Sequence, residues 1–139
     1  MPVEAITRLV SDACTQVIER RAPTVLVLRI EGHDVGEFGS LPMRCLEALL
    51  PDGLGIELFV DARATRGVTM HASNDWAAWL GRHRDRFIGV HMLTGSRYVQ
   101  VTAEFVRRFT GLEDRMKVYS DAAAFDAELA AVTGRQGAL

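Results

Sequence analysis

Three residues near the middle of the chain, Asp61, His71 and Ser73, are of the types that carry out acyl transfer, in which a base activates a serine hydroxyl. The pattern is weak, because no G-x-S-x-G motif surrounds Ser73 or Ser96, and a helix-capping role explains either serine without catalysis. The histidines show no H-E-x-x-H or comparable metal-binding spacing. We therefore expect neither an enzyme nor a metal or other cofactor site.

A second group of polar residues follows two apolar runs, 56–62 and 87–94, and suits binding better than catalysis. If these runs are neighbouring parallel strands, their carboxyl ends meet at one edge of a sheet, where loops are free to vary. A helix opening at Arg97 would add free backbone N–H groups and favour an anionic group on a protein partner or small ligand. The alternative is that these residues bind nothing and are three solvated arginines around an ordinary helix cap. The predicted recognition surface consists of Asp61, Arg63, Thr65, Arg66, Ser96 and Arg97.

Composition narrows the class of protein. The 139 residues with 48% hydrophobic content fit one domain with its own core, and the net charge of -2 gives no general case for a nucleic-acid partner. No apolar run approaches the ~20 residues of a membrane span, and the first residues do not resemble a secretory signal, so we expect a cytoplasmic protein. Cys14 and Cys45 have no metal-ligand spacing and are interpreted as reduced thiols.

The elements that would position the surface begin with 56–62, an apolar run that we predict to be a central strand covered on both faces. Residues 15–20 and 24–30 flank a short break at Pro23, which favours a hairpin whose first strand lies at the sheet edge. Segment 1–14 precedes the hairpin, and the pattern of its residues 3–14 fits helix or strand. An amphipathic helix with Pro42 near its start is predicted between the hairpin and the central strand.

The second half of the chain alternates helix and strand. A helix capped by Ser73 or Asn74 should precede strand 87–94, and Ser96 should cap the next helix. We expect strand 116–119 and a last helix capped by Asp121, with the domain spanning 15–133 and a disordered tail at 134–139. The inner face of the helix after Ser96 is predicted to consist of Tyr98, Val101, Thr102, Phe105 and Phe109.

This order of elements predicts an α/β domain with a mainly parallel sheet of about five strands in sequential order, an antiparallel N-terminal edge strand and four helices. Strands in sequential order create no reversal point, and hence no nucleotide-binding crevice of the doubly wound kind. We therefore expect no binding of NAD or ATP.

The run Leu58-Phe59-Val60-Asp61-Ala62-Arg63, the tryptophans at 76 and 79, Thr94-Gly95-Ser96, and Val118-Tyr119-Ser120-Asp121 with Phe125 resemble the STAS superfamily of anti-sigma-factor antagonist-like domains. The resemblance implies a non-enzymatic regulatory or protein-interaction domain that binds its partner through the loops after strands 56–62 and 87–94. It also implies an alternative, a carrier of a small or lipid-type ligand with an apolar cavity beneath the loop 64–72, as in the related CRAL-TRIO fold. A homo-oligomer is left open.

Regulatory members of that superfamily carry an Asp-Ser pair after the strand, and a partner kinase phosphorylates the serine. Here Ala62-Arg63-Ala64-Thr65 stands in its place, leaving Thr65, Thr69 or Ser73 as substitutes. No serine is therefore expected to act as an efficient switch. Thr65 is the best residual candidate, since a phosphate there would lie beside Arg63 and Arg66.

Overall fold

The computed structural model describes residues 6–136. Within them the chain forms one sheet of six strands in sequential order, four α-helices and one short 3-10 helix. The strands are β1 (Ile6–Val10), β2 (Cys14–Ala22), β3 (Val25–Asp34), β4 (Ile56–Val68), β5 (Phe87–Thr94) and β6 (Met116–Tyr119). The helices are α1 (Leu41–Leu49), α2 (Met70–Arg82), α3 (Arg97–Phe109) and α4 (Ala122–Arg135), with the 3-10 helix η1 at Arg84–Arg86.

The sheet combines two kinds of pairing. Strands β1, β2 and β3 pair antiparallel, and β3, β4, β5 and β6 pair parallel. The predicted hairpin is confirmed as β2 and β3, but the edge position was assigned to the wrong strand. Residues 6–10 form β1, which lies outside β2 and is itself the edge. Residues 1–5 of the predicted N-terminal segment lie outside the described part.

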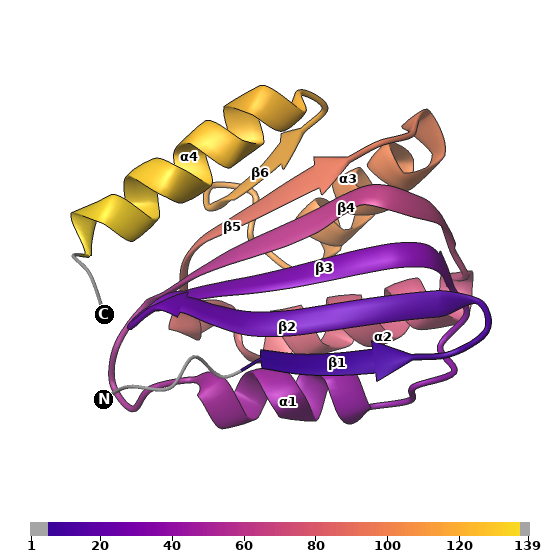
Figure 1. Ribbon diagram of the computed structural model, residues 1–139, viewed down its shortest axis with the longest axis horizontal. Helices are drawn as coiled ribbons and strands as arrows, with labels where there is room; N and C mark the ends of the chain where they lie inside the picture. The colour runs from indigo at the N-terminus through magenta and orange to yellow at the C-terminus, as the bar shows by residue number, and fades with distance from the viewer. Residues whose placement is uncertain (1–5, 137–139) are drawn as a thin grey trace.

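Helices cover the two faces of the sheet unequally (Figure 1). Helices α1, α2 and α3 pack on one face, where Leu58, Trp79 and Val106 belong to the larger apolar cluster. Helix α4 covers β5 and β6 on the other face, where Phe59, Phe125 and Leu129 form a smaller cluster. Strand β4 thus carries buried side chains on both faces, as predicted for a central strand.

Two element boundaries differ from the sequence prediction. Residues 63–68, expected as a loop, continue β4 beside the end of β3, down to the pair Asp34 and Val68. Helix α2 consequently starts earlier, at Met70, and the hydroxyl oxygen of Thr69 caps it by accepting a bond from the Ala72 amide. The predicted caps Ser73 and Asn74 lie inside this helix. The polar composition of 63–68 resembled a loop, although its backbone groups pair with β3.

The end of the chain also differs from the prediction. Helix α4 continues to Arg135, so residues 134 and 135 belong to a helix and not to a tail. The Gln136 side chain accepts a hydrogen bond from the Thr24 amide at 2.9 Å, which ties the end of α4 to the start of β3. Residues 137–139 of the predicted tail lie outside the described part.

Candidate functional site

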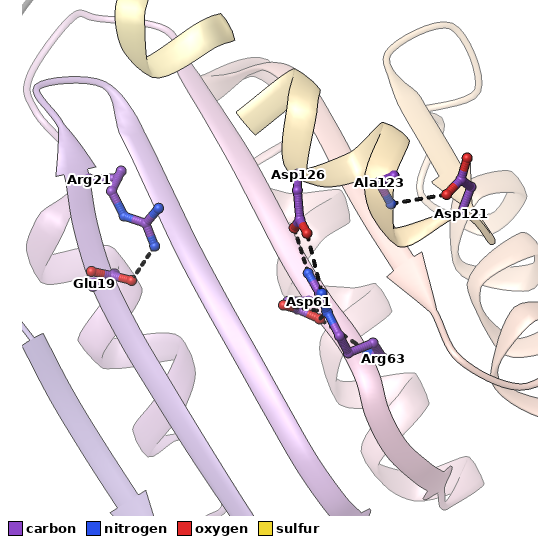
Figure 2. A network of polar contacts seen from close by, with 7 residues as sticks. All are labelled: Glu19, Arg21, Asp61, Arg63, Asp121, Ala123 and Asp126. Atoms are coloured by element: carbon purple, nitrogen blue, oxygen red, sulfur yellow. Dashed lines mark hydrogen bonds and ion pairs between the residues drawn. The ribbon is translucent and has the colours of Figure 1, made fainter. Parts of the chain in front are cut away.

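Asp61 and Arg63 lie on the face of β4 that α4 only partly covers (Figure 2). The Asp61 carboxylate accepts hydrogen bonds from the Arg63 amide at 3.1 Å and from Arg63 Nε at 3.0 Å. The other end of the guanidinium reaches helix α4, where it donates to Asp126 Oδ1 at 2.6 Å. Arg63 therefore bridges the sheet and α4 between two carboxylates.

This bridge changes the expected role of Arg63. Hydrogen bonds to Asp126 and then to Asp61 raise the pKa of the Arg63 guanidinium above its ordinary value. Two carboxylates already neutralise the single positive charge, so Arg63 offers little attraction to an incoming anion. The predicted surface is left with Arg66 and Arg97, both exposed, as its cationic groups.

Thr65 is the predicted site residue whose surroundings differ most from expectation. Its side chain is 3% exposed, within β4, and its hydroxyl donates to the Ile30 carbonyl at 2.7 Å. A kinase requires an accessible hydroxyl, whereas the Thr65 hydroxyl is buried and already hydrogen-bonded to the neighbouring strand β3. The geometry gives no support to Thr65 as a phosphate acceptor.

Ser96 and Arg97 lie where β5 passes into α3. The Ser96 hydroxyl oxygen accepts a hydrogen bond from the Val99 amide at 3.2 Å, as predicted for a cap. The preceding Gly95 packs directly on the backbone carbonyl of Arg63, leaving no room for a Cβ atom. The end of β5 therefore lies beside Arg63, five residues before β4 ends at Val68, because β4 is longer than predicted.

Helix α3 is rotated about its axis relative to the prediction. Of the five residues expected on its inner face, Thr102 is half-buried and the other four are exposed: Tyr98 by 77%, Val101 by 67%, Phe105 by 46% and Phe109 by 68%. The side chains that pack on the sheet are smaller, namely Val99, Ala103 and Val106. We call Tyr98, Val101, Phe105 and Phe109 the α3 stripe. The sequence did contain a signal for this orientation, because Val99, Ala103 and Val106 form a second apolar series of smaller residues at the same helical spacing.

A narrow apolar cavity of about 60 Å³ lies between the sheet and helices α2 and α3. Its walls include Leu58 and Val60 of β4, Leu80 of α2 and Val106 of α3. At one side Asp34 accepts a hydrogen bond from the Trp76 indole at 3.1 Å. The alternative carrier function would require an apolar cavity beneath a loop at 64–72. The cavity instead lies under two helices, since that segment is strand and helix.

The three residues that could form a catalytic set interact with different partners and not with one another. His71 lies 3.4 Å from Asp75 in the first turns of α2, while Asp61 is bound to Arg63. Ser73 is buried within α2, and its backbone amide donates to the Thr69 carbonyl. Within residues 6–136 no group of three or more histidines, cysteines or carboxylates is placed to hold a metal ion.

A polar row that sequence reasoning missed runs across the parallel strands beneath α4. His91 Nε2 lies 2.6 Å from Glu57 Oε2, and His91 Nδ1 lies 3.0 Å from the Tyr119 hydroxyl. The imidazole stacks on Phe59 with ring centroids 4.1 Å apart, and Gly89 leaves space for the Glu57 carboxylate. Burial raises the pKa of Tyr119. Every ring nitrogen has a partner, so this row is a satisfied part of the core.

Comparison with known proteins finds no matching family model and no matching curated protein. Two solved structures are similar over nearly their whole length. An uncharacterized protein of the DUF3478 family with a SpoIIAA-like fold, from Shewanella loihica PV-4, is 17% identical, with a TM-score of 0.59 over 93% of this chain and 97% of its own. An anti-sigma factor antagonist from Mycobacterium paratuberculosis is 14% identical, with a TM-score of 0.58 over 87% of this chain and 97% of its own.

At these identities the likeness concerns the fold. The STAS-like α/β fold that the sequence resemblance predicted is confirmed, including the sequential strand order and the four helices within residues 6–136. None of the helices in that part of the chain is long and apolar enough to cross a membrane.

Proposed function

We propose that this STAS-like domain is a non-enzymatic regulatory module that binds a protein partner. The observation that carries the proposal is the α3 stripe, an apolar surface that the fold leaves exposed. Tyr98, Val101 and Phe109 are each more than half exposed. Contiguous apolar surface with a polar rim marks interaction sites, whereas single exposed apolar residues do not. A partner that covers the stripe would bury it.

The proposed surface is continuous with the one expected from the sequence. Ser96 and Arg97 open α3 directly after β5, so a partner on the α3 stripe would also reach the loop at the end of that strand. Gly95 holds that loop against the Arg63 carbonyl of β4, and Arg66, three residues further along the strand, is exposed. In this proposal Ser96, Arg97 and Arg66 belong to the partner-binding surface, while Asp61 and Arg63 tie α4 to the sheet.

A site-specific photo-cross-linker tests the proposal in cells of the native source. Placed at Val101, it should give one discrete adduct. Placed at Val10 of β1, which is exposed to a similar extent at 62% against 67%, it should give none. The Val101 adduct should disappear when Phe105 is replaced by aspartate. Equal adducts at both valines, or an adduct indifferent to Phe105→Asp, would contradict partner binding through α3.

The cavity beneath α2 and α3 is the feature that bears on the alternative function, carriage of a small apolar ligand. Its volume of about 60 Å³ is well below the roughly 300 Å³ at which pockets begin to hold drug-sized ligands. A lipid chain would therefore require α3 to move away from the sheet. Native mass spectrometry of the purified protein should show the bare chain mass, and a retained acyl ligand would instead favour the carrier. Cytoplasmic location remains a prediction from the sequence.

A further inference from the structure

We infer that the α3 stripe takes an amphipathic segment with an acidic rim from a partner protein, most simply a helix. This inference rests on the proposed function and adds the chemistry of the partner. The stripe residues Tyr98, Val101, Phe105 and Phe109 follow each other at steps of three and four, so they lie along one side of the helix. From Tyr98 to Phe109 the stripe rises about 16 Å along the helix axis, whereas anchors from i to i+7 of a second helix span about 10 Å. The stripe is therefore long enough to receive anchors at i, i+3, i+4 and i+7.

The stripe is held rigid without taking part in the core. Val99, Ala103 and Val106 fix α3 to the sheet, and Ser96 caps its first turn. The rings of Phe105 and Phe109 stack on each other with centroids 5.5 Å apart. Aromatic side chains that are already ordered lose little conformational entropy when a partner covers them. This side of α3 is therefore a suitable docking surface in the free protein.

The charged side chains beside the stripe are predominantly basic. Arg97, Glu104 and Arg108 occupy the adjacent helical row, and the Glu104 carboxylate accepts a hydrogen bond from Arg107 at 2.7 Å. Arg97 and Arg108 form no ion pair with any residue between 6 and 136. The chain as a whole carries a net charge of -2, so the positive charge beside the stripe is a local feature and not a property of the whole surface. Carboxylates on the partner would complement it.

The same charges argue against the other occupants. In a two-fold pairing of two α3 helices, the arginines of one copy would face those of the other, and like charges across an interface are unfavourable. For a lipid surface, Gln100 and Glu104 line the same shallow hollow as Val101 and Phe105. If the stripe inserted into the hydrocarbon of a membrane, the Glu104 carboxylate would also enter an apolar environment, at a considerable desolvation cost. A protein segment can leave those groups hydrated or hydrogen-bonded.

The test uses two synthetic amphipathic helical peptides with the same leucine face, one with glutamates and one with lysines on the flanking positions. Fluorescence anisotropy should show the glutamate peptide binding the wild-type protein about tenfold or more tightly than the lysine peptide. Its affinity should fall several-fold between about 0.05 M and about 0.5 M salt. The double variant Arg97→Glu/Arg108→Glu should reverse the preference. Phe105→Asp should abolish binding of both peptides, and Val10→Asp should leave binding unchanged.

Equal binding of the two peptides, no binding of the glutamate peptide, or binding that survives Phe105→Asp would overturn the inference. So would sedimentation with phosphatidylglycerol vesicles that depends on Phe105, or a Phe105-dependent dimer in analytical ultracentrifugation. The cross-link at Val101 separates the two levels of the argument. If the peptides fail while the specific Val101 adduct persists, the partner chemistry is wrong and the protein-binding function stands. If the adduct is also missing, the proposed function fails.

Discussion

Replacing Val60 with aspartate tests the central position of β4 and the character of the cavity beside it. Val60 is 8% exposed, lies between Leu28 of β3 and Met92 of β5, and forms part of the cavity wall. Among residues 6–136, the lining of the cavity is mostly apolar and includes Asp34 but no cationic side chain, so a carboxylate there would have no partner of opposite charge. We expect severe destabilisation with a characteristic dependence on pH.

The magnitude follows from two terms. Loss of the buried valine side chain costs about 2 kcal/mol. An isolated buried carboxylate is neutralised instead of ionised, and protonating a group of ordinary pKa ~3.9 at pH 7 costs about 4 kcal/mol at ~1.4 kcal/mol per pH unit. The sum, about 6 kcal/mol, equals much of the roughly 5–15 kcal/mol by which such domains are stable. The folded pKa is raised, so the protonation cost falls on acidification, to about 1.5 kcal/mol at pH 5.

Urea unfolding followed by circular dichroism at pH 5 and pH 7 measures both terms. Val60→Asp should be about 2 to 3 kcal/mol less damaging at pH 5 than at pH 7. Val10→Asp provides the matched control, because it makes the same substitution at a strand position that is 62% exposed. The control should change the free energy of unfolding by less than about 0.5 kcal/mol at either pH.

A cooperative Val60→Asp protein within about 1 kcal/mol of wild type at pH 7, with no gain at pH 5, would refute this reasoning. That result would mean that the carboxylate is hydrated in the folded state. A cavity of about 60 Å³ has room for ordered water, which needs roughly 10 to 15 Å³ per molecule, so such a result would show that the cavity is wet.

Further predictions concern thiols, ion pairs and ligands. Burial raises the pKa of Cys14 to about 11, so Ellman's reagent should modify the half-buried Cys45 first and Cys14 only after unfolding. The protonated Cys14 thiol stabilises the fold fully below pH 9.0 and loses this effect toward pH 11, so wild type should lose more stability than Cys14→Ala between pH 8.5 and 10.5, as urea titrations would detect. Asp126→Asn should cost under about 1 kcal/mol and less in high salt, since the pair with Arg63 is exposed. Intact-mass analysis of protein from its native source should find no stoichiometric phosphate on Thr65, because the hydroxyl is buried. Calorimetry with NAD and ATP should show no binding, because sequential strands form no nucleotide crevice.

The sheet could be predicted from the sequence because each parallel strand is a short apolar run bounded by turn or cap residues. Strand 87–94 was predicted with its observed limits, and Ser96 and Asp121 cap the helices expected of them. Their side-chain oxygens accept amide hydrogen bonds at the first turn, which is a local interaction that sequence encodes directly.

The orientation of α3 could not be predicted by the same means. The helix has two apolar series, and the larger side chains, such as Phe105, were assigned to the core because burial of large apolar groups is the stronger driving force. The structure instead packs the small Ala103 and Val99 on the sheet, which lets the helix approach closely. Which series turns inward depends on the space above β4, β5 and β6, and that space exists only in the assembled fold.

The extension of β4 was missed for a related reason. Residues 63–68 are polar or small, and periodicity gives such a segment no strand signal. Pairing with the long β3 makes them a strand, and the same pairing buries Thr65 against Ile30. The predicted site therefore consists of two separate parts. Asp61 and Arg63 connect the sheet to α4 through Asp126, while Ser96 and Arg97 lie at the start of α3, beside the α3 stripe.

The sequential strand order has a consequence for the way the chain is made. Each strand pairs with the strand synthesised just before it, so the sheet can grow from β1 toward β6 as the chain leaves the ribosome, without inserting a late strand between earlier ones. Helix α4 arrives last and shields Phe59 on the otherwise open face. The bond between Gln136 and the amide of Thr24 then joins segments 112 residues apart. Until that step, the growing sheet exposes one apolar face, and this interval is when the nascent protein is most exposed to aggregation.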